Sequence, residues 1–547
     1  MDMRQRIAEL LAPLLNKSLV EVSSLLTIPP DPKLGDYALP CFILGKNPHD
    51  EAQKLKSRLK IPGFLSHLEV MGPYLNFFVN TSFLAQETLT AVQKEKKNYG
   101  KQQQKGTILV EYCGPNTNKP LHLGHLRNMT IGLTMVNIYR FLGKTVHPVN
   151  IVNDRGIHIC QSMLAYQKWG KEKKPTKKGD HFVGDYYVLF AQAVKENEDL
   201  KKEAQELLLK WERGDTETRA LWKKMTTWVL KGFQETYQRF GVQFDTEYFE
   251  SQYYEKGKEV VAEGLKKGIF VKDHTEAVIA PLESLGLPDK VLLRGDETSL
   301  YITQDLYLAD LRYRDYHYDR LIYVVASEQQ LHFKQLFAIL RLLKRPYTDA
   351  LYHLSYGLVN LPTGRMKSRE GTVVDADDLL DELTVIAEKE VKSRHANLSS
   401  KEIQQRAEQI ALAAIKFYMI RTDAVKDIVF NPEESLSFEG ETGPYIQYTH
   451  ARTCSILRQA NVSRHLNVDF TLLQHPLEHQ LIKKLSEWGE VVAKVGQTYQ
   501  PHLLAHYLVA LAQQFSEYYH ACPVISDDKQ LMAGRLLLVD SVRKVLQ

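Results

Sequence analysis

The chain has 547 residues, of which 44% are hydrophobic and 25% charged, with a formal net charge of +4 at pH 7. This composition excludes a disordered chain and is that of a globular protein, and the length predicts about three or four domains. No apolar run reaches the roughly 18 residues that a membrane helix needs, and the N-terminus has no signal-peptide core. We therefore expect a cytoplasmic protein that does not bind membranes.

Five cysteines are scattered along the chain with no Cys-x-x-Cys pair. This pattern argues against a zinc ribbon and against a disulfide framework, and it fits a reducing compartment. We expect no metal that is bound by the protein itself. The small net charge does not by itself indicate a polyanionic partner, so any nucleic-acid surface must come from local patches.

The first 104 residues are predicted to form a separate domain. Helical apolar spacing covers residues 7–15 and returns between Gly35 and the loop at Pro62-Gly63, and residues 68–79 have the composition of strands. A helix near residues 81–97 leads out of this segment. Mixed elements of this kind indicate an α+β domain.

The next segment combines the signals of a strand, a loop and a helix N-terminus. The apolar run 108–113 predicts a buried strand, and the spacing of residues 126–142 predicts a helix that ends at Gly143. The loop between them ends in His122-Leu-Gly-His125. Because a helix N-terminus attracts anions and the imidazoles could donate to phosphates, we expect a nucleotide site here.

Strands and helices continue to alternate beyond this site. Residues 146–152 predict a second strand with Asp154 at its carboxyl end, where ligands of parallel sheets gather. Residues 165–290 interrupt the alternation and are predicted to be an insertion, rich in helices, that packs on the sheet. Its basic run, residues 168–178, is either a mobile, solvated surface loop or a contact for nucleic acid.

The sheet is predicted to resume after the insertion, with strands at residues 300–305, 321–326 and 351–359. Strands that alternate with helices in this way indicate a doubly wound parallel sheet. From about residue 400 the pattern is helical almost throughout, which indicates an all-α bundle. Its expected helices cover residues 403–420, 445–460, 481–495, 503–520 and 531–546.

A second nucleotide signal is the glycine-bounded segment 364–371. It carries the cations Arg365, Lys367 and Arg369 at alternate positions, and helical spacing follows over residues 375–383. Such a segment is either an ordinary solvated loop or a site for a nucleoside triphosphate.

Tyr301 and Asp305 are four residues apart and share one face if a helix begins there. A phenol beside a carboxylate could grip a planar, charged guanidinium in a way that would not serve a neutral side chain. The alternative is a helix cap beside a core tyrosine, which the spacing alone favours.

The segment around the two histidines resembles a known family. His122-Leu-Gly-His125 is similar to the His-x-Gly-His signature of class I aminoacyl-tRNA synthetases and related nucleotidylyltransferases. The longer stretch from Glu111 to Asn128 resembles the arginyl-tRNA synthetases. The resemblance covers essentially the whole chain.

Two segments depart from the pattern of that family. Residues 364–374 resemble its Lys-Met-Ser-Lys-Ser loop, but Ser368 stands where the second lysine is expected. Asp154-Arg155-Gly156-Ile157-His158 keeps the Asp and the Gly of the usual Asp-Trp-Gly-x-Gln, without its aromatic and amide residues.

The resemblance implies a set of site residues. For ATP it implies Lys119, His122, Gly124, His125, Met366, Lys367 and Ser368, and the catalytic residues would be His122, His125, Lys367 and Arg369. For arginine it implies Glu111 and Asn116 near the α-amino group, with Tyr301, Asp305 and Gln329 at the guanidinium. For tRNA it implies Tyr445, Gln447, Tyr448 and Arg452, as stacking platforms and a phosphate contact.

The resemblance also implies a multidomain α/β protein. Its parts would be a tRNA-contacting α+β domain (1–104), a Rossmann-like class I catalytic domain with the insertion (105–400), and an α-helical anticodon-binding domain (401–547). The expected reaction activates arginine with ATP, which brings its own Mg²⁺, and transfers arginine to the terminal adenosine of tRNA(Arg). In this family the first step is generally tRNA-dependent, and we expect a monomer.

Three alternatives stay open. They are a class I synthetase for another amino acid, a related nucleotidylyltransferase, and a catalytically silent tRNA-binding paralogue.

Overall fold

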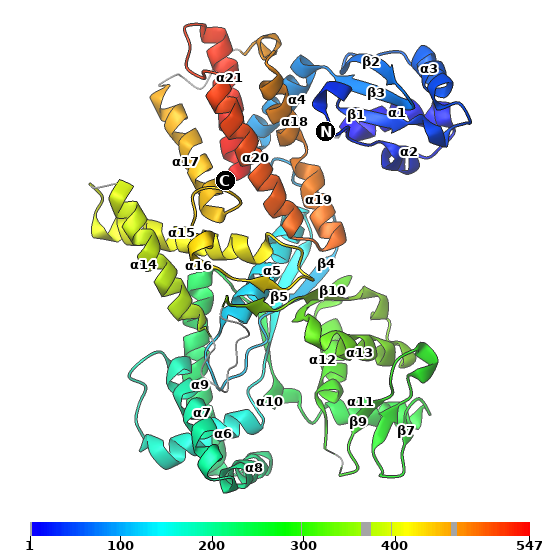
Figure 1. Cartoon of the computed structure of the whole chain (residues 1–547). Coiled ribbons are helices and arrows are strands. Elements are labelled where there is room, and N and C mark those ends of the chain that lie inside the picture. The colour runs from blue at the N-terminus through cyan, green and yellow to red at the C-terminus, as the bar shows by residue number, and fades with distance from the viewer. Residues whose placement is uncertain (1–2, 297, 363–373, 395–396, 461–467) are drawn as a thin grey trace. The chain divides into compact units, whose positions relative to one another are not determined.

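The structure, a computed structural model, describes residues 3–296, 298–362, 374–394, 397–460 and 468–547 (Figure 1). The chain divides into two compact units. One contains Gln102–Pro444 and Val495–Ala505, and the other contains Met1–Lys101, Tyr445–Lys494 and His506–Gln547.

Five parallel strands form the central sheet of the first unit, in the order β11-β10-β4-β5-β6. They are β4 (Thr107–Glu111), β5 (Thr145–Val152), β6 (Thr246–Phe249), β10 (Arg320–Ala326) and β11 (Leu351–Tyr356). The predicted doubly wound parallel sheet is confirmed. The chain runs outward from β4 to β6 and then returns to the other side of β4, so the strand order reverses between β4 and β10. Ligands of such sheets bind at the carboxyl ends of the strands beside this reversal.

Helices cover both faces of the sheet, because its strands carry apolar residues on both faces. On one face, Leu109, Val149 and Leu321 share a core with α12 (Tyr301–Tyr316) and α13 (Gln330–Leu342). Helix α5 (Leu123–Phe141) packs on β4, β5 and β10, and it also contacts α14 (Ala376–Arg394) and α15 (Ser400–Ile420). The short strands β12 (Val359–Asn360) and β13 (Ile428–Val429) pair in parallel, and α16 (Pro432–Ser435) follows β13.

The strand predicted at residues 300–305 is wrong, because these residues open helix α12. Leu300 N donates to Oγ1 of Thr303 at 3.2 Å, and Thr303 N donates to Leu300 O at 2.9 Å. A run of six residues is too short to distinguish the period of a strand from that of the first turn of a helix. Here the buried side chains of Ile302, Leu306 and Ala309 follow the helical period.

The range predicted as an insertion is largely helical, as expected. It contains α7 (Gly179–Glu196), α8 (Asp199–Glu212), α9 (Thr216–Phe240), α10 (Glu250–Tyr253) and α11 (Gly257–Lys266), preceded by α6 (Ile157–Ala165). The edge strand β6 also lies in this range, and so does a small antiparallel sheet. That sheet consists of β7 (Val271–Lys272), β8 (Val278–Ala280) and β9 (Lys290–Leu293).

Helix α5 approaches strand β4 closely at Gly132, where a Cβ would lie 2.3 Å from Cγ of the buried Tyr112. Gly132→Ala is therefore expected to destabilise the fold by about 1–3 kcal/mol, although alanine is the better helix former. Thermal unfolding measures this, and Asn137→Ala, at an exposed position of the same helix, is the control with a change below about 0.5 kcal/mol. Equal melting temperatures for the two variants would contradict the close packing.

The second unit starts with an α+β segment, as predicted. Its antiparallel sheet has the order β1-β3-β2, with β1 (Tyr37–Pro40), β2 (Leu65–Met71) and β3 (Tyr74–Val79). The helices are α1 (Met3–Leu15), α2 (Leu19–Leu25), α3 (Pro48–Arg58) and α4 (Thr81–Glu95). The helical spacing expected from Gly35 onward is found only in α3, because residues 37–40 pair with β3 instead.

The C-terminal part consists of helices, and the prediction of an all-α bundle is confirmed. They are α17 (Gly443–Gln459), α18 (Pro476–Ser486), α19 (Trp488–Thr498), α20 (His502–Ala521) and α21 (Lys529–Leu546). The single helix predicted over 481–495 is wrong: α18 ends and α19 begins there. Trp488 at the break donates from Nε1 to Tyr99 O at 3.0 Å, a distant contact that periodicity cannot reveal. Within the described residues, no helix is both long and apolar enough to cross a membrane.

Candidate active site

A cavity of about 850 Å³ opens at the carboxyl ends of the strands, beside the reversal of strand order. Strand ends contribute residues 111–114, Ile151, Asn153, residues 324–326 and Tyr356 to its wall. Helix α5 and the residue before it contribute His122, Gly124, His125 and Asn128, while α12 and α13 contribute Tyr301, Asp305 and His332. The volume is that of a site for small molecules. The two histidines and the Tyr301/Asp305 pair therefore line the same cavity.

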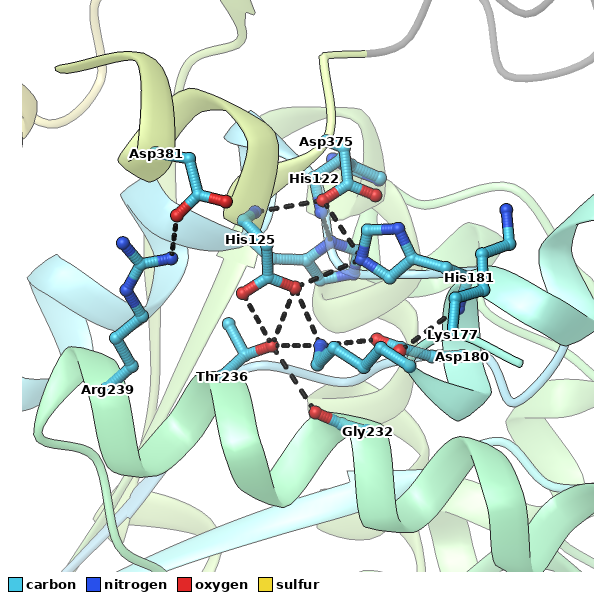
Figure 2. A network of polar contacts seen from close by, with 12 residues as sticks. His122, His125, Lys177, Asp180, His181, Gly232, Thr236, Arg239, Asp375 and Asp381 are labelled. Atoms are coloured by element: carbon cyan, nitrogen blue, oxygen red, sulfur yellow. Dashed lines mark hydrogen bonds and ion pairs between the residues drawn. The ribbon is translucent and has the colours of Figure 1, made fainter. Parts of the chain in front are cut away.

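The two histidines are held by the backbone of the helix start, and Figure 2 shows them side by side. His122 is the N-cap of α5, and its Nδ1 accepts from Gly124 N at 3.2 Å. Nδ1 of His125 accepts from His122 N at 3.1 Å, and the two ring centroids are 3.9 Å apart. Because each Nδ1 accepts a hydrogen bond, each neutral ring carries its proton on Nε2.

Both imidazoles are neutral at physiological pH. Burial, together with the positive charge of Lys119, lowers the pKa of His122 to about 3. Burial also lowers the pKa of His125 well below its usual value, and His122 and Lys119 add to the effect. The site therefore offers two neutral Nε2–H donors, which can stabilise negative charge on a phosphate without first losing a proton.

The wall of the same cavity also contains a carboxylate. Asp305 lies one turn after Tyr301 on α12, and Tyr301 is 71% exposed at the cavity wall. Oδ2 of Asp305 is 2.6 Å from Nε2 of His332, which lies at the start of α13. His332 thereby fixes the orientation of the carboxylate and leaves its second oxygen for a ligand. A phenol and an oriented carboxylate at one wall suit a planar cation with several N–H donors.

Glu111 is held by an internal partner. Its carboxylate contacts the guanidinium of Arg312, and both side chains are buried. Burial raises the pKa of Glu111 despite the positive charge of Arg312. The pair joins the end of β4 to helix α12, and so it ties the two walls of the cavity together.

Comparison with known proteins finds three family models that match successive parts of the chain. The family model "tRNA synthetases class I (R), catalytic domain" matches residues 88–432, "DALR anticodon binding domain" matches 446–547, and "Arginyl tRNA synthetase N terminal domain" matches 1–79. The chain belongs to the arginyl-tRNA synthetase family. The resemblance that the segment around His122 indicated, and the class of enzyme, are thus confirmed.

Curated relatives of this synthetase are similar over almost the whole chain. The arginine–tRNA ligase of Treponema pallidum is 44% identical over 539 residues, which cover 95% of this chain and 92% of the relative. That of Treponema denticola is 43% identical over 541 residues, with the same coverage. The solved arginyl-tRNA synthetase of Thermus thermophilus superposes with a TM-score of 0.85 at 28% identity, covering 100% of this chain and 97% of that one.

Several other predicted site residues of the synthetase can be placed. Asn116 and Gln329 line the large cavity and are exposed. Lys119 lines a second, smaller cavity next to His122 instead. Asp154 is absent from the wall of the large cavity, because its carboxylate accepts two hydrogen bonds from Ser251, at 2.8 and 2.6 Å. The predicted residues Met366, Lys367, Ser368 and Arg369 lie outside the described residues.

The residues predicted for tRNA lie on helix α17 of the other unit. The guanidinium of Arg452 donates to Tyr448 Oη at 2.8 Å and lies 5.4 Å from the centre of the Tyr519 ring. Tyr448 is 39% exposed, whereas Tyr445 and Gln447 are partly buried.

Two cavity residues were missed in the sequence. His332 orients Asp305, and the amide of Asn128 joins three strand ends. Nδ2 of Asn128 donates to Val324 O at 2.8 Å and to Tyr356 Oη at 3.1 Å, and Oδ1 accepts from Cys113 N. A buried asparagine in a helix was a detectable signal for Asn128. His332 carried no such signal, because its partner is 27 residues away.

Proposed function

We propose that this cavity activates L-arginine with Mg-ATP and then transfers the arginyl group to the 3′-terminal adenosine of tRNA(Arg). The observation that carries the proposal is the shared cavity, whose wall contains both an oriented carboxylate and two neutral imidazole donors. Asp305 and Tyr301 would bind the guanidinium, and Gln329 would add a polar contact. Asn116 and Glu111 would lie near the α-amino group.

In the activation step an oxygen of the arginine carboxylate attacks the α-phosphorus of ATP. A C(O)O–P bond forms, the bond from that phosphorus to the bridging oxygen breaks, and pyrophosphate leaves with the electron pair. Nε2–H of His122 and of His125 would donate to the phosphate oxygens, on which negative charge grows, while Gly124 admits the nucleotide to the helix N-terminus. The Mg²⁺ that ATP carries neutralises its phosphates. We assign Lys119, Met366, Lys367, Ser368 and Arg369 to the phosphates as well.

In the transfer step a hydroxyl of the terminal ribose attacks the activated carbonyl and releases AMP. Helix α17 would contact the anticodon through Tyr445, Gln447, Tyr448 and Arg452, and residues 1–104 would contact the tRNA elbow. We place this synthetase in the cytoplasm as a monomer. All five cysteines are free thiols, as expected in a reducing compartment.

The test is the exchange of labelled pyrophosphate into ATP with each of the twenty amino acids, with and without tRNA. Of the twenty amino acids, only arginine should support exchange, and tRNA(Arg) should increase the exchange rate. Exchange with another amino acid, or none with arginine in the presence of tRNA, would overturn the proposed substrate.

A further inference from the structure

A cluster of mostly half-buried charges lies close to the two histidines, among residues that do not line the large cavity (Figure 2). The ammonium of Lys178 is 2.9 Å from Oδ2 of Asp180, 2.6 Å from Oδ2 of Asp377 and 2.6 Å from Oγ1 of Thr236. These contacts use all three N–H donors of a lysine. The side chain of Lys178 is only 17% exposed, so it is not part of a solvated basic loop. Asp180 is completely buried.

His181 joins the same cluster from the first turn of α7. Its Nε2 is 3.2 Å from Oδ2 of Asp377 and 3.5 Å from Oδ1 of Asp375. Hydrogen bonding to Asp377 raises the pKa of His181 despite burial. Burial raises the pKa of Asp377, but hydrogen bonds from His181 and Lys178 outweigh it and lower this pKa to about 2. The cluster therefore links α7 and α9 to the start of α14.

The start of α14 is joined to the catalytic histidine through the backbone. Asp375 stands opposite His122 in an antiparallel bridge, flanked by hydrogen bonds from Leu123 N to Val374 O and from Ala376 N to Leu121 O, both 3.0 Å. The facing residues of such a bridge are a non-hydrogen-bonded pair, whose side chains lie close on one face. Oδ1 of Asp375 also accepts from Asp377 N at 2.9 Å, which ties it to the cluster.

Asp180, His181 and Asp377 have the spacing of a metal site. The ammonium of Lys178 already lies between Asp180 and Asp377, so this set contains its cation within the protein. Buried ion pairs add little net stability, because desolvation offsets their attraction, but they restrict where their groups can lie. For Asp180 and Asp377, a role in positioning therefore fits better than metal binding.

We propose that Lys178 and Asp377 are positioning residues for His122. They fix the start of α14 against α7 and α9, and the bridge at Asp375 passes that position on to the histidine. This inference rests on the proposed role of His122 at the phosphate. Displacement of a group by about 1 Å can cost up to about a hundredfold in rate. Binding of arginine should be unaffected, because Tyr301 and Asp305 make no contact with the cluster.

The experiment compares Asp377→Asn with Asp381→Asn in pyrophosphate exchange with tRNA present. Asp381 lies one turn further along α14 and pairs with Arg239 of α9 at 2.7 Å, so it joins the same two helices at an exposed position (Figure 2). Asp377→Asn should lower kcat about tenfold to a hundredfold and leave the KM for arginine within about twofold. Asp381→Asn should match the unmodified enzyme.

Three further variants complete the test: Lys178→Met alone, its combination with Asp377→Asn, and His122→Ala. Lys178→Met combined with Asp377→Asn should cost no more than the worse single change, since both act through one cluster. His122→Ala in the same assay separates the two claims, because retained activity there would reject the role of His122 itself. If His122→Ala loses activity while Asp377→Asn keeps a normal kcat, the positioning role is wrong. A parallel loss in arginine KM would also reject it, because general distortion of the cavity would be the cause.

Discussion

Asp305→Asn is expected to raise the KM for arginine about a hundredfold and to leave the KM for ATP within about twofold. Asparagine keeps the size of the side chain and one carbonyl oxygen, but it loses the charge that pairs with the guanidinium. Truncating one partner of a buried charge pair costs about 2–5 kcal/mol, and each 1.4 kcal/mol is about a factor of ten. Pyrophosphate exchange at varied arginine and ATP measures both constants.

The control for this change is Asp315→Asn on the same helix. Asp315 accepts from Tyr248 Oη at 3.2 Å and does not line the cavity, so both KM values should stay unchanged. Citrulline, a neutral analogue with the shape of arginine, gives a second readout: Asp305→Asn should discriminate far less between the two. Equal losses for arginine and ATP would reject the assignment of Asp305.

Two substitutions of His122 should distinguish the role of Nδ1 in the helix cap from the role of Nε2 in the reaction. His122→Asn keeps an acceptor near the Nδ1 position, so the helix cap and the melting temperature should be retained, while kcat for exchange falls about 10²-fold to 10³-fold. His122→Gln places an amide N–H near the Nε2 position, so kcat should fall less than about tenfold. It should lose about 1 kcal/mol of stability with the cap. Exchange kinetics and thermal unfolding of the two variants measure this contrast.

The pH dependence gives an independent check on His122. Since its pKa is lowered to about 3, the ring is neutral at every pH above about 5, and the ratio of unmodified to His122→Gln rates should be constant from pH 6 to 8. A charged imidazole would instead lose its proton as pH rises through that range. The unmodified enzyme would then lose its higher rate relative to His122→Gln. A ratio that falls with rising pH would contradict neutral donors.

Local patterns in the sequence were sufficient for much of the fold. The segments that became β4, β5 and β10 are buried on both faces, and they were recognised because such strands are rich in apolar residues. Most helices after residue 400 were also predicted, since they have an apolar stripe, but the break between α18 and α19 was not. The start of α12 was missed, because six residues cannot separate a period of 2 from a period of 3.6.

The candidate site was predicted where a short motif or a fixed spacing carried it. His122 and His125 belong to one helix start, and Tyr301 and Asp305 to one helical face. The charged cluster near His122 was not predictable, because Lys178 contacts Asp377 across 199 residues of sequence. Lys178 also stood in a lysine-rich run that is typical of a solvated surface. Only the fold shows that this lysine is half-buried and lies between two carboxylates.

The most direct test of the shared cavity is a crystal structure of this chain with a non-reactive analogue of arginyl-adenylate. The guanidinium should lie within hydrogen-bonding distance of Asp305 and Tyr301, and the group that replaces the phosphate should accept from Nε2 of His122 or His125. A complex in which the arginine side chain lies away from Asp305, or the adenylate away from both imidazoles, would contradict the proposed site.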